Sequence, residues 1–296
     1  MNAVRSFDAV VVGGGPAGCS AAGHLARSGF SVLVIDRTTF PRDKACSDGI
    51  TARAAEHLRR MDPDLLNLGY PVRGVRVFYK RKGQDPGVRE FGFDDASIRL
   101  IPRTILDLKL KEWATRQGAE SWEHTTCEAV TAEPNGGFLV RVRPGHSSTR
   151  VDIRARLVVG ADGATSVVRR AIGLKNDGQF CPGYGVRMYV ENIEGLNSFV
   201  EIYLLAALWE ELTAIGSAWV FPVGPGRANV GVAVYKTRQA EPAPNLKHLL
   251  RNFFEWLKRT DPRFSVVSRQ VCKRRFPSRT GSFASSGVEN QGCLSL

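Results

Sequence analysis

The stretch FDAVVVGGGPAG at residues 7–18 decides the fold of this 296-residue chain. Its apolar first half is typical of a buried β-strand, and a second apolar run, SVLVID, follows at residues 31–36. The residues between them, 17–28, have the composition of a helix, which Gly29 ends. A strand, a glycine-rich turn, a helix and a second strand in this order predict the first βαβ unit of a Rossmann-like parallel sheet.

Three glycines in this stretch have the spacing GxGxxG: Gly13, Gly15 and Gly18. We expect the first to make the tight turn, the second to let a pyrophosphate approach the backbone, and the third to let helix and strand pack closely. The N-terminus of the helix then presents unpaired N–H groups to the phosphates. This arrangement predicts a dinucleotide site rather than a glycine-rich turn of some other α/β fold.

Asp36 ends the second strand, at the place where a carboxylate accepts both ribose hydroxyls of a dinucleotide. An acid at this position disfavours the 2′-phosphate of NADP, so NAD or FAD is preferred. The candidate cofactor residues on this βαβ unit are Gly13, Gly15, Pro16, Ala17, Gly18, Asp36 and Arg37.

The composition is typical of a soluble globular protein. Of the residues, 43% are hydrophobic and 24% charged, and no apolar run approaches the roughly 18 residues that a membrane span needs. The first strand begins almost at the N-terminus, without a secretory leader, so we expect a cytoplasmic protein. Six cysteines without a CxxC pair and five scattered histidines predict reduced thiols and no metal site.

The net charge of +12 comes from basic residues that are spread along the chain. No run of them is dense enough for a nucleic-acid arm, and no aromatic residues alternate with them, so we expect no nucleic-acid partner. Two interpretations remain open. The basic surface either is solvated and helps to capture an anionic cofactor, or is attracted to an anionic membrane surface.

Strand and turn patterns divide the chain into two domains. The cofactor domain takes residues 1–71 and 103–183, and a β-rich substrate domain takes residues 72–102 and 184–276. Alternating apolar residues and turn signals indicate the strands of the second domain. Residues 277–296 are expected to return toward the cofactor domain. The predicted class is therefore α/β, a Rossmann-like domain with a second, sheet-based domain.

Four further segments carry a resemblance to a known family. FPRDKACSDGITARA at residues 40–54 and GADGATSVVRR at residues 160–170 are the most specific, and an RxxxD helix start at residues 103–107 is the third. The fourth is AWVFP at residues 218–222, followed by NVGV at residues 229–232. Together they resemble the geranylgeranyl reductase family, within the flavoproteins that include the aromatic hydroxylases and flavin-dependent halogenases. The resemblance extends over essentially the whole chain.

The resemblance implies an FAD-dependent oxidoreductase. Its cofactor is expected to be FAD, reduced by NAD(P)H or another electron donor, and its substrate a small molecule or lipid with a prenyl chain of the geranylgeranyl or menaquinone type. The reaction adds a hydride from reduced flavin and a proton across a C=C bond, while the protein supplies geometry, a dry site and the proton donor. A prenyl-lipid substrate also fits peripheral contact with a membrane.

The resemblance extends the candidate cofactor site to two further regions. It implies that Arg103 reaches the cofactor from its helix and that Asp162 and Gly163 support the pyrophosphate side. Toward the isoalloxazine ring it implies a flavin loop that contains Lys44, Cys46, Asp48 and Gly49.

The same resemblance implies catalytic and substrate residues. Lys44 and Cys46 are the catalytic candidates, with the Cys46 thiol as the proton donor or relay. An apolar tunnel for the prenyl chain is expected to be lined by Trp219, Phe221 and Pro222. Each assignment has an ordinary alternative, which is packing for the thiol and the aromatic rings and a solvated loop charge for Lys44.

Two positions depart from the family pattern, and two other functions remain open. Ser47 stands where the family has glycine, and Ser217 stands where it has tyrosine. A flavin-dependent monooxygenase or halogenase acting on a small aromatic or polyketide is the first alternative, although the WxWxIP segment of halogenases is absent. The second is a non-catalytic fragment. The sequence ends at residues 292–296, where the family's GDAAG-type FAD segment is expected, so we expect a chain truncated before that segment.

Overall fold

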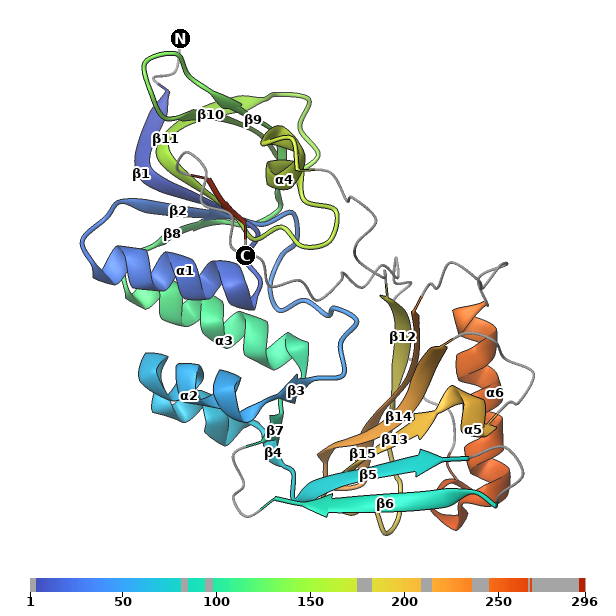
Figure 1. Cartoon of the computed structure of the whole chain (residues 1–296). Helices are drawn as coiled ribbons and strands as arrows, with labels where there is room; N and C mark the ends of the chain where they lie inside the picture. Colours follow the sequence, from blue (N-terminus) through green and yellow to red (C-terminus); the bar gives the residue numbers. More distant parts are fainter. Residues whose placement is uncertain are drawn as a thin grey trace. The chain divides into compact units, whose positions relative to one another are not determined.

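The computed structural model describes residues 4–80, 85–93, 98–174, 183–208, 215–235, 245–265, 267 and 293–295. The chain forms two compact units, which are drawn in Figure 1. Unit 1 comprises residues 1–43, 103–180 and 283–296, and unit 2 comprises residues 44–102 and 181–282. The sequence-based division placed residues 44–71 in the cofactor domain, whereas contacts group them with unit 2.

Unit 1 contains the predicted parallel βαβ core. Its strands are β1 (Arg5–Val12), β2 (Val32–Ile35), β8 (Glu120–Trp122), β9 (Thr125–Ala132), β10 (Phe138–Pro144), β11 (Val151–Gly160) and β16 (Cys293–Ser295). The sheet order is β8-β2-β1-β11-β10-β9, and β16 pairs with β11. β1 runs parallel to β2 and β11, whereas β10 runs antiparallel to β9 and β11. The short apolar strands β1 and β2 are buried because they lie inside this sheet.

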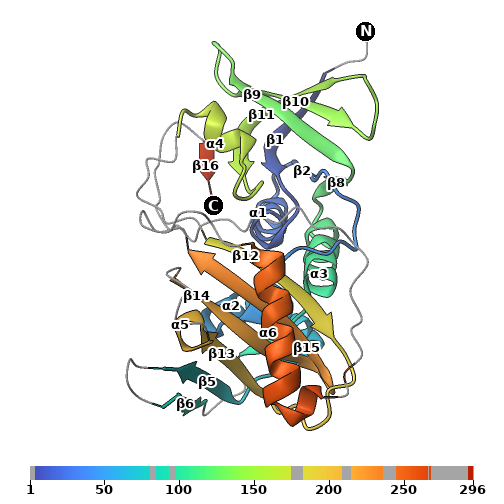
Figure 2. The same cartoon turned by 90° about the vertical axis from the view of Figure 1, so that its right-hand side faces the viewer.

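The described helices of unit 1 are α1 (Pro16–Arg27), α3 (Arg103–Arg116) and α4 (Val167–Ala171). Figures 1 and 2 show α1 and α3 next to one another beside the sheet. Gly23 of α1 permits this contact, because a Cβ there would lie 2.0 Å from the Trp113 ring of α3. Trp113 is buried at this contact, which packs the second half of α1 against the C-terminal part of α3.

Unit 2 contains a six-stranded sheet of order β12-β15-β14-β13-β5-β6 and a small sheet of order β3-β7-β4. The strands of the large sheet are β5 (Gly74–Tyr79), β6 (Gly87–Gly92), β12 (Gly183–Val190), β13 (Phe199–Leu204), β14 (Ile215–Gly224) and β15 (Arg227–Tyr235). The small sheet has β3 (Gly49–Ile50), β4 (Tyr70–Pro71) and β7 (Arg99–Leu100). The described helices are α2 (Ala52–Met61), the 3-10 helix η1 (Pro63–Leu68), α5 (Leu205–Leu208), α6 (Leu246–Thr260) and the 3-10 helix η2 (Pro262–Phe264).

Helix α6 covers one face of the large sheet, as Figure 2 shows. Val220 of β14 and Val232 of β15 are fully buried in one apolar cluster with Phe253 and Leu257 of α6. Because side chains alternate along a strand, Trp219 lies on the opposite face, where it is half-buried. One face of the sheet therefore forms the core of unit 2, and the other face carries the side chains considered below.

The predicted α/β class, a Rossmann-like domain with a second sheet-based domain, is confirmed. Within the described ranges, no helix has both the length and the apolar character required to cross a bilayer. The same ranges contain no group of three or more side chains arranged to hold a metal ion. Cys19, Cys46 and Cys127 are free thiols, while Cys181 and Cys272 lie outside the described residues.

Candidate functional site

The glycine-rich turn of unit 1 has a shape that only glycine allows. Gly13 has a φ of +103°, and a Cβ there would lie 2.3 Å from the Ala161 carbonyl oxygen. A Cβ at Gly18 would lie 1.8 Å from the Gly13 carbonyl oxygen, so α1 packs on the turn backbone against backbone. Gly15 caps α1 without a side-chain hydrogen bond, and Pro16 is its first residue. The first turn of α1 therefore keeps N–H groups that no capping side chain satisfies.

Asp36 is held directly against this turn. Its Oδ2 accepts a hydrogen bond of 2.8 Å from the Gly14 N–H. Its Oδ1 accepts from the N–H and the hydroxyl of Thr38, at 2.8 and 2.6 Å. These bonds fix the carboxylate at the carboxyl end of β2, and Oδ2 keeps a lone pair for a further donor. Behind the turn, burial raises the pKa of Cys19 to about 12, and its neutral thiol donates to the Gly14 carbonyl.

Two arginines lie at Gly15. A Cβ at Gly15 would be 3.4 Å from Arg42 Nη2 and 3.9 Å from Arg103 Nη2. Both guanidinium groups bind the fully buried carboxylate of Asp107, Arg103 through Nε and Nη2 at 2.7 and 2.8 Å and Arg42 through Nη1 at 3.0 Å. Asp107 neutralises only one of the two guanidinium groups, so this cluster of three side chains carries one positive charge at Gly15. Sequence reasoning left Arg42 out of the candidate site, although the FPRDK motif contains it.

Asp162 completes the turn from the end of β11. Its Oδ2 accepts a 2.6 Å hydrogen bond from the Val167 N–H at the start of α4. Its Oδ1 is buried and has no hydrogen-bond partner among the described residues. The Asp162 Cα lies 2.9 Å from the position of a Cβ on Gly13, so the two segments touch. Gly163 is exposed with a φ of +80°, and Arg37 is also exposed.

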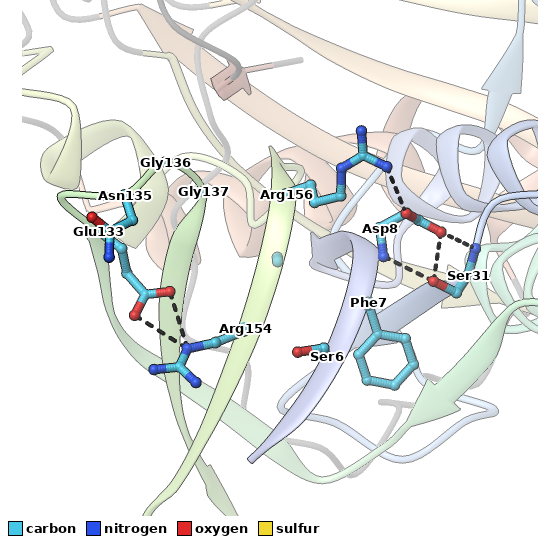
Figure 3. A pocket seen from close by; sticks show the side chains of 11 residues that line it. Ser6, Phe7, Asp8, Ser31, Glu133, Asn135, Gly136, Gly137, Arg154 and Arg156 are labelled. Carbon is cyan, nitrogen blue, oxygen red and sulfur yellow. Dashed lines mark hydrogen bonds and ion pairs between the residues drawn. The ribbon is translucent and has the colours of Figure 1, made fainter.

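This part of unit 1 fits a dinucleotide. The Gly15 backbone, which carries no Cβ, and the uncapped helix N-terminus suit a pyrophosphate, and the two guanidinium groups beside Gly15 suit its anionic oxygens. The carboxylate of Asp36 suits ribose hydroxyls. A groove of about 660 Å³ lies elsewhere in unit 1, at the opposite end of β1 (Figure 3).

That groove has its own closed set of ion pairs, visible in Figure 3. Arg154 binds Glu133 at 3.2 Å, and Arg156 binds Asp8 at 3.1 Å. Hydrogen bonds from Ser31 to Asp8 hold the pKa of this carboxyl below its ordinary value. None of the candidate residues lines the groove. Because Arg154 and Arg156 are paired with carboxylates, they are less suited to bind an anionic ligand. The glycine-rich turn is therefore the better candidate for a dinucleotide site.

In unit 2, the predicted flavin loop lies on the sheet face opposite α6. Cys46 is half-buried, Asp48 is only 1% exposed, and both Lys44 and Gly49 are exposed. Asp48 has a φ of +68°, a left-handed conformation that aspartate tolerates better than most residues. The carbonyl of Cys46 and the carboxylate of Asp48 both accept hydrogen bonds from Asn229 of β15. Sequence reasoning quoted Asn229 within a motif but gave it no role.

Two of the three predicted substrate residues lie together. Trp219 and Phe221 of β14 have ring centroids 6.2 Å apart on the sheet face that also carries Asn229. The Trp219 ring lies across Gly231, where a Cβ would come within 2.1 Å of it. Pro222 is buried and follows Phe221 in the same strand. Strand alternation places it on the α6 face, so the structure does not bring it together with the two rings.

Comparisons with known proteins agree with this geometry. A menaquinone reductase from Mycolicibacterium smegmatis is 30% identical over 266 residues, covering 86% of this chain and 61% of that protein. A digeranylgeranylglycerophospholipid reductase from Methanosarcina acetivorans is 27% identical over 256 residues, covering 84% of this chain and 60% of that protein. The chain thus spans about three fifths of the length of these curated relatives.

Solved structures share the fold as well. A geranylgeranyl bacteriochlorophyll reductase-like protein from Thermoplasma acidophilum superimposes with a TM-score of 0.76 at 23% identity, covering 99% of this chain and 71% of that one. Flavin-dependent halogenases have the same fold at 16–20% identity. Residues 6–204, from β1 to the end of β13, match the FAD binding domain family. Because this match covers more than half of the sequence, the chain belongs to the FAD binding domain family.

Proposed function

We propose that this chain acts as an FAD-dependent oxidoreductase that reduces C=C bonds of an isoprenoid chain. The observation that carries the proposal lies within unit 2, where the half-buried Cys46 is bound to one sheet face through its carbonyl and the rings of Trp219 and Phe221, which we term the apolar wall, lie on the same face. Asn229 binds the Cys46 carbonyl and accepts a hydrogen bond from Trp219, and Phe221 is its partner on the neighbouring strand. An unactivated alkene requires a proton donor and an apolar wall. The names of the relatives, a menaquinone reductase and a digeranylgeranylglycerophospholipid reductase, support this substrate class.

We assign the ADP half of FAD to the glycine-rich turn of unit 1. The backbone of Gly13, Gly15 and Gly18 admits the pyrophosphate, and Arg103 and Arg42 supply its positive partners. Asp36 accepts from the ribose hydroxyls. Asp162 is assigned to the same cofactor, because its Oδ1 is a buried acceptor that no described residue satisfies.

Reduced FAD, when bound, supplies the hydride of the reaction. Cys46 Sγ–H donates the proton to the second alkene carbon, so that one C=C bond becomes one C–C bond with two new C–H bonds. The resulting thiolate regains a proton from solvent. Lys44, exposed at the start of the loop, is the second catalytic candidate. Trp219 and Phe221 orient the prenyl chain and exclude water from it.

NAD(P)H is our proposed electron donor, and the 296-residue chain loaded with FAD provides the test of the reaction. Under anaerobic conditions, with dithionite or NAD(P)H as reductant, a geranylgeranyl lipid in detergent should gain two hydrogens per reduced bond by mass spectrometry. A chain that instead consumes oxygen when given a small aromatic substrate is a monooxygenase or halogenase. A chain that binds FAD but does neither is a non-catalytic fragment.

Replacing the thiol tests the proton donor. We expect Cys46→Ala to keep FAD bound and to slow alkene reduction by about 100- to 10,000-fold, the range for one positioned general acid. The matched control is Cys127→Ala, since Cys127 is a buried thiol in unit 1 whose pKa burial raises to about 12. Equal single-turnover rates for wild type and Cys46→Ala would assign this thiol to packing.

Asp36→Ala tests the cofactor site. Loss of the ionised acceptor should weaken FAD binding by about 1–3 kcal/mol, or roughly 5- to 150-fold in dissociation constant, measured by flavin fluorescence quenching. Asp8→Ala is the control, because Asp8 also accepts hydrogen bonds from a neighbouring segment but lies at the other end of β1. If both variants bind FAD like wild type, the cofactor does not use this βαβ unit.

We also propose that this chain is cytoplasmic and makes peripheral contact with a membrane, because a prenyl-lipid substrate lies in the membrane. The edge strand β6 carries Val88 and Phe91, each 53% exposed. Phe91→Asp should release the chain from anionic phosphatidylglycerol vesicles in a pelleting assay, since apolar area and basic charge both strengthen such binding. Phe30→Asp, at a 48% exposed phenylalanine of unit 1, is the control. Identical pelleting of both variants would exclude β6 as the contact.

A further inference from the structure

We infer that Asn229 and Tyr189 are positioning residues that fix the Cys46 loop of unit 2. Together with Asp48 they form what we term the loop latch. The latch joins the loop to β12 and β15 and also reaches the Trp219 ring. The role of the latch in catalysis rests on the proposed function, whereas its role in holding the conformation of the Cys46 loop does not.

Asn229 is the centre of the latch. Its Nδ2 donates one hydrogen bond of 2.8 Å to the Cys46 carbonyl and another of 2.8 Å to Asp48 Oδ2. Its Oδ1 accepts a 3.0 Å hydrogen bond from Trp219 Nε1. The side chain is fully buried. Both N–H groups and the carbonyl are therefore used, and the opposite amide orientation would set N–H against N–H.

Tyr189 holds the loop from the neighbouring strand. Its hydroxyl donates a 2.6 Å hydrogen bond to Asp48 Oδ2, the oxygen that Asn229 also binds. Arg187 and Arg227 lie over the Tyr189 ring at 4.1 and 4.7 Å from its centroid. Arg187 also donates to the Lys44 carbonyl at 3.3 Å, which adds a contact at the start of the loop.

The latch holds Asp48 in a left-handed backbone conformation. Asp48 has a φ of +68°, a backbone region that persists in a non-glycine residue only when surrounding contacts determine it. Its own carbonyl accepts from the Ile101 N–H at 2.9 Å, so both backbone and side chain are held. Cys46 is two residues away and carries no latch bond on its side chain. Its thiol is therefore positioned through the backbone on either side of Ser47.

The side chain of Asn229 thus positions two groups of the proposed reaction, the proton donor and the apolar wall. Asn229 binds the backbone of the proton donor and the ring of the apolar wall, so displacement of its amide moves both. Misplacement of a reacting group by about 1 Å costs on the order of 100-fold in rate. This is why we classify Asn229 as a positioning residue rather than as part of the packing of the sheet.

The sheet offers a matched pair of tyrosines for the test. Tyr189 and Tyr203 are both buried, and each donates its hydroxyl to a buried carboxylate, Asp48 at 2.6 Å and Glu201 at 3.0 Å. Only Tyr189 contacts the loop, because Tyr203 lies on the face covered by α6, against Phe253. Tyr189→Phe and Tyr203→Phe therefore each remove one tyrosine hydroxyl from the same sheet. Only Tyr189→Phe removes a hydrogen bond of the latch.

The measurement is the alkylation rate of Cys46 in the folded 296-residue chain, without FAD or substrate. Trypsin releases this cysteine in the peptide ACSDGITAR, residues 45–53, so mass spectrometry follows it separately. Tyr189→Phe should raise the rate about fivefold, as expected for loss of one hydrogen bond that limits local opening. Asn229→Ala should raise it by about tenfold or more, and Tyr203→Phe by less than about twofold.

Two results would overturn the inference: an unchanged rate in Tyr189→Phe, or an equal rise in Tyr203→Phe. If Asn229→Ala does not fold, the tyrosine pair still decides the question. In the alkene assay, Asn229→Ala should lower kcat with little change in KM, whereas Tyr203→Phe should change neither. Because the alkylation assay needs no flavin, it separates failure of the latch from failure of the proposed reductase activity.

Discussion

The cofactor end of unit 1 depends on the contact between two backbone segments, at Gly13 and Gly18. A methyl group on Gly18 would lie 1.8 Å from the Gly13 carbonyl, so any side chain there forces α1 away from β1. That close approach brings the uncapped start of α1 to the end of β1. It also leaves the Gly14 N–H facing Asp36, and the open side of Gly15 facing Arg42. The close contact of Gly13 and Gly18 thus brings the N-terminus of α1, the carboxylate of Asp36 and the two arginines together at the glycine-rich turn.

Much of unit 1 could be predicted from the sequence because its signals are local. The apolar runs, the glycine spacing and the acid at position 36 all lie within about thirty residues, where strand and helix periods constrain the chain strongly. The α/β class and the dinucleotide turn follow from them. The same signals do not separate reductases from halogenases, because both have this fold. The function therefore rests on residues that the fold does not dictate.

The polar contacts that hold the candidate site could not be predicted in this way. Tyr189 and Asn229 lie 141 and 181 residues from Asp48, and such pairs produce no periodicity in the sequence. Arg42 was missed for the same reason, since its partner Asp107 belongs to a later helix. Pro222 is different. Strand alternation already separates it from Trp219 and Phe221, and the motif led us to group residues that the pleat places on opposite faces.

The Trp219 ring lies on Gly231, and this has a consequence for how such sequences diverge. The two residues face each other across β14 and β15, and the indole occupies the space that a side chain at position 231 would need. Position 231 therefore cannot gain a side chain while the tryptophan keeps this place. A homologue that gains a side chain at 231 has to replace the tryptophan with something smaller or turn the ring off the sheet. Covariation of these two positions, across many sequences, would mark where this face of the sheet has been reshaped.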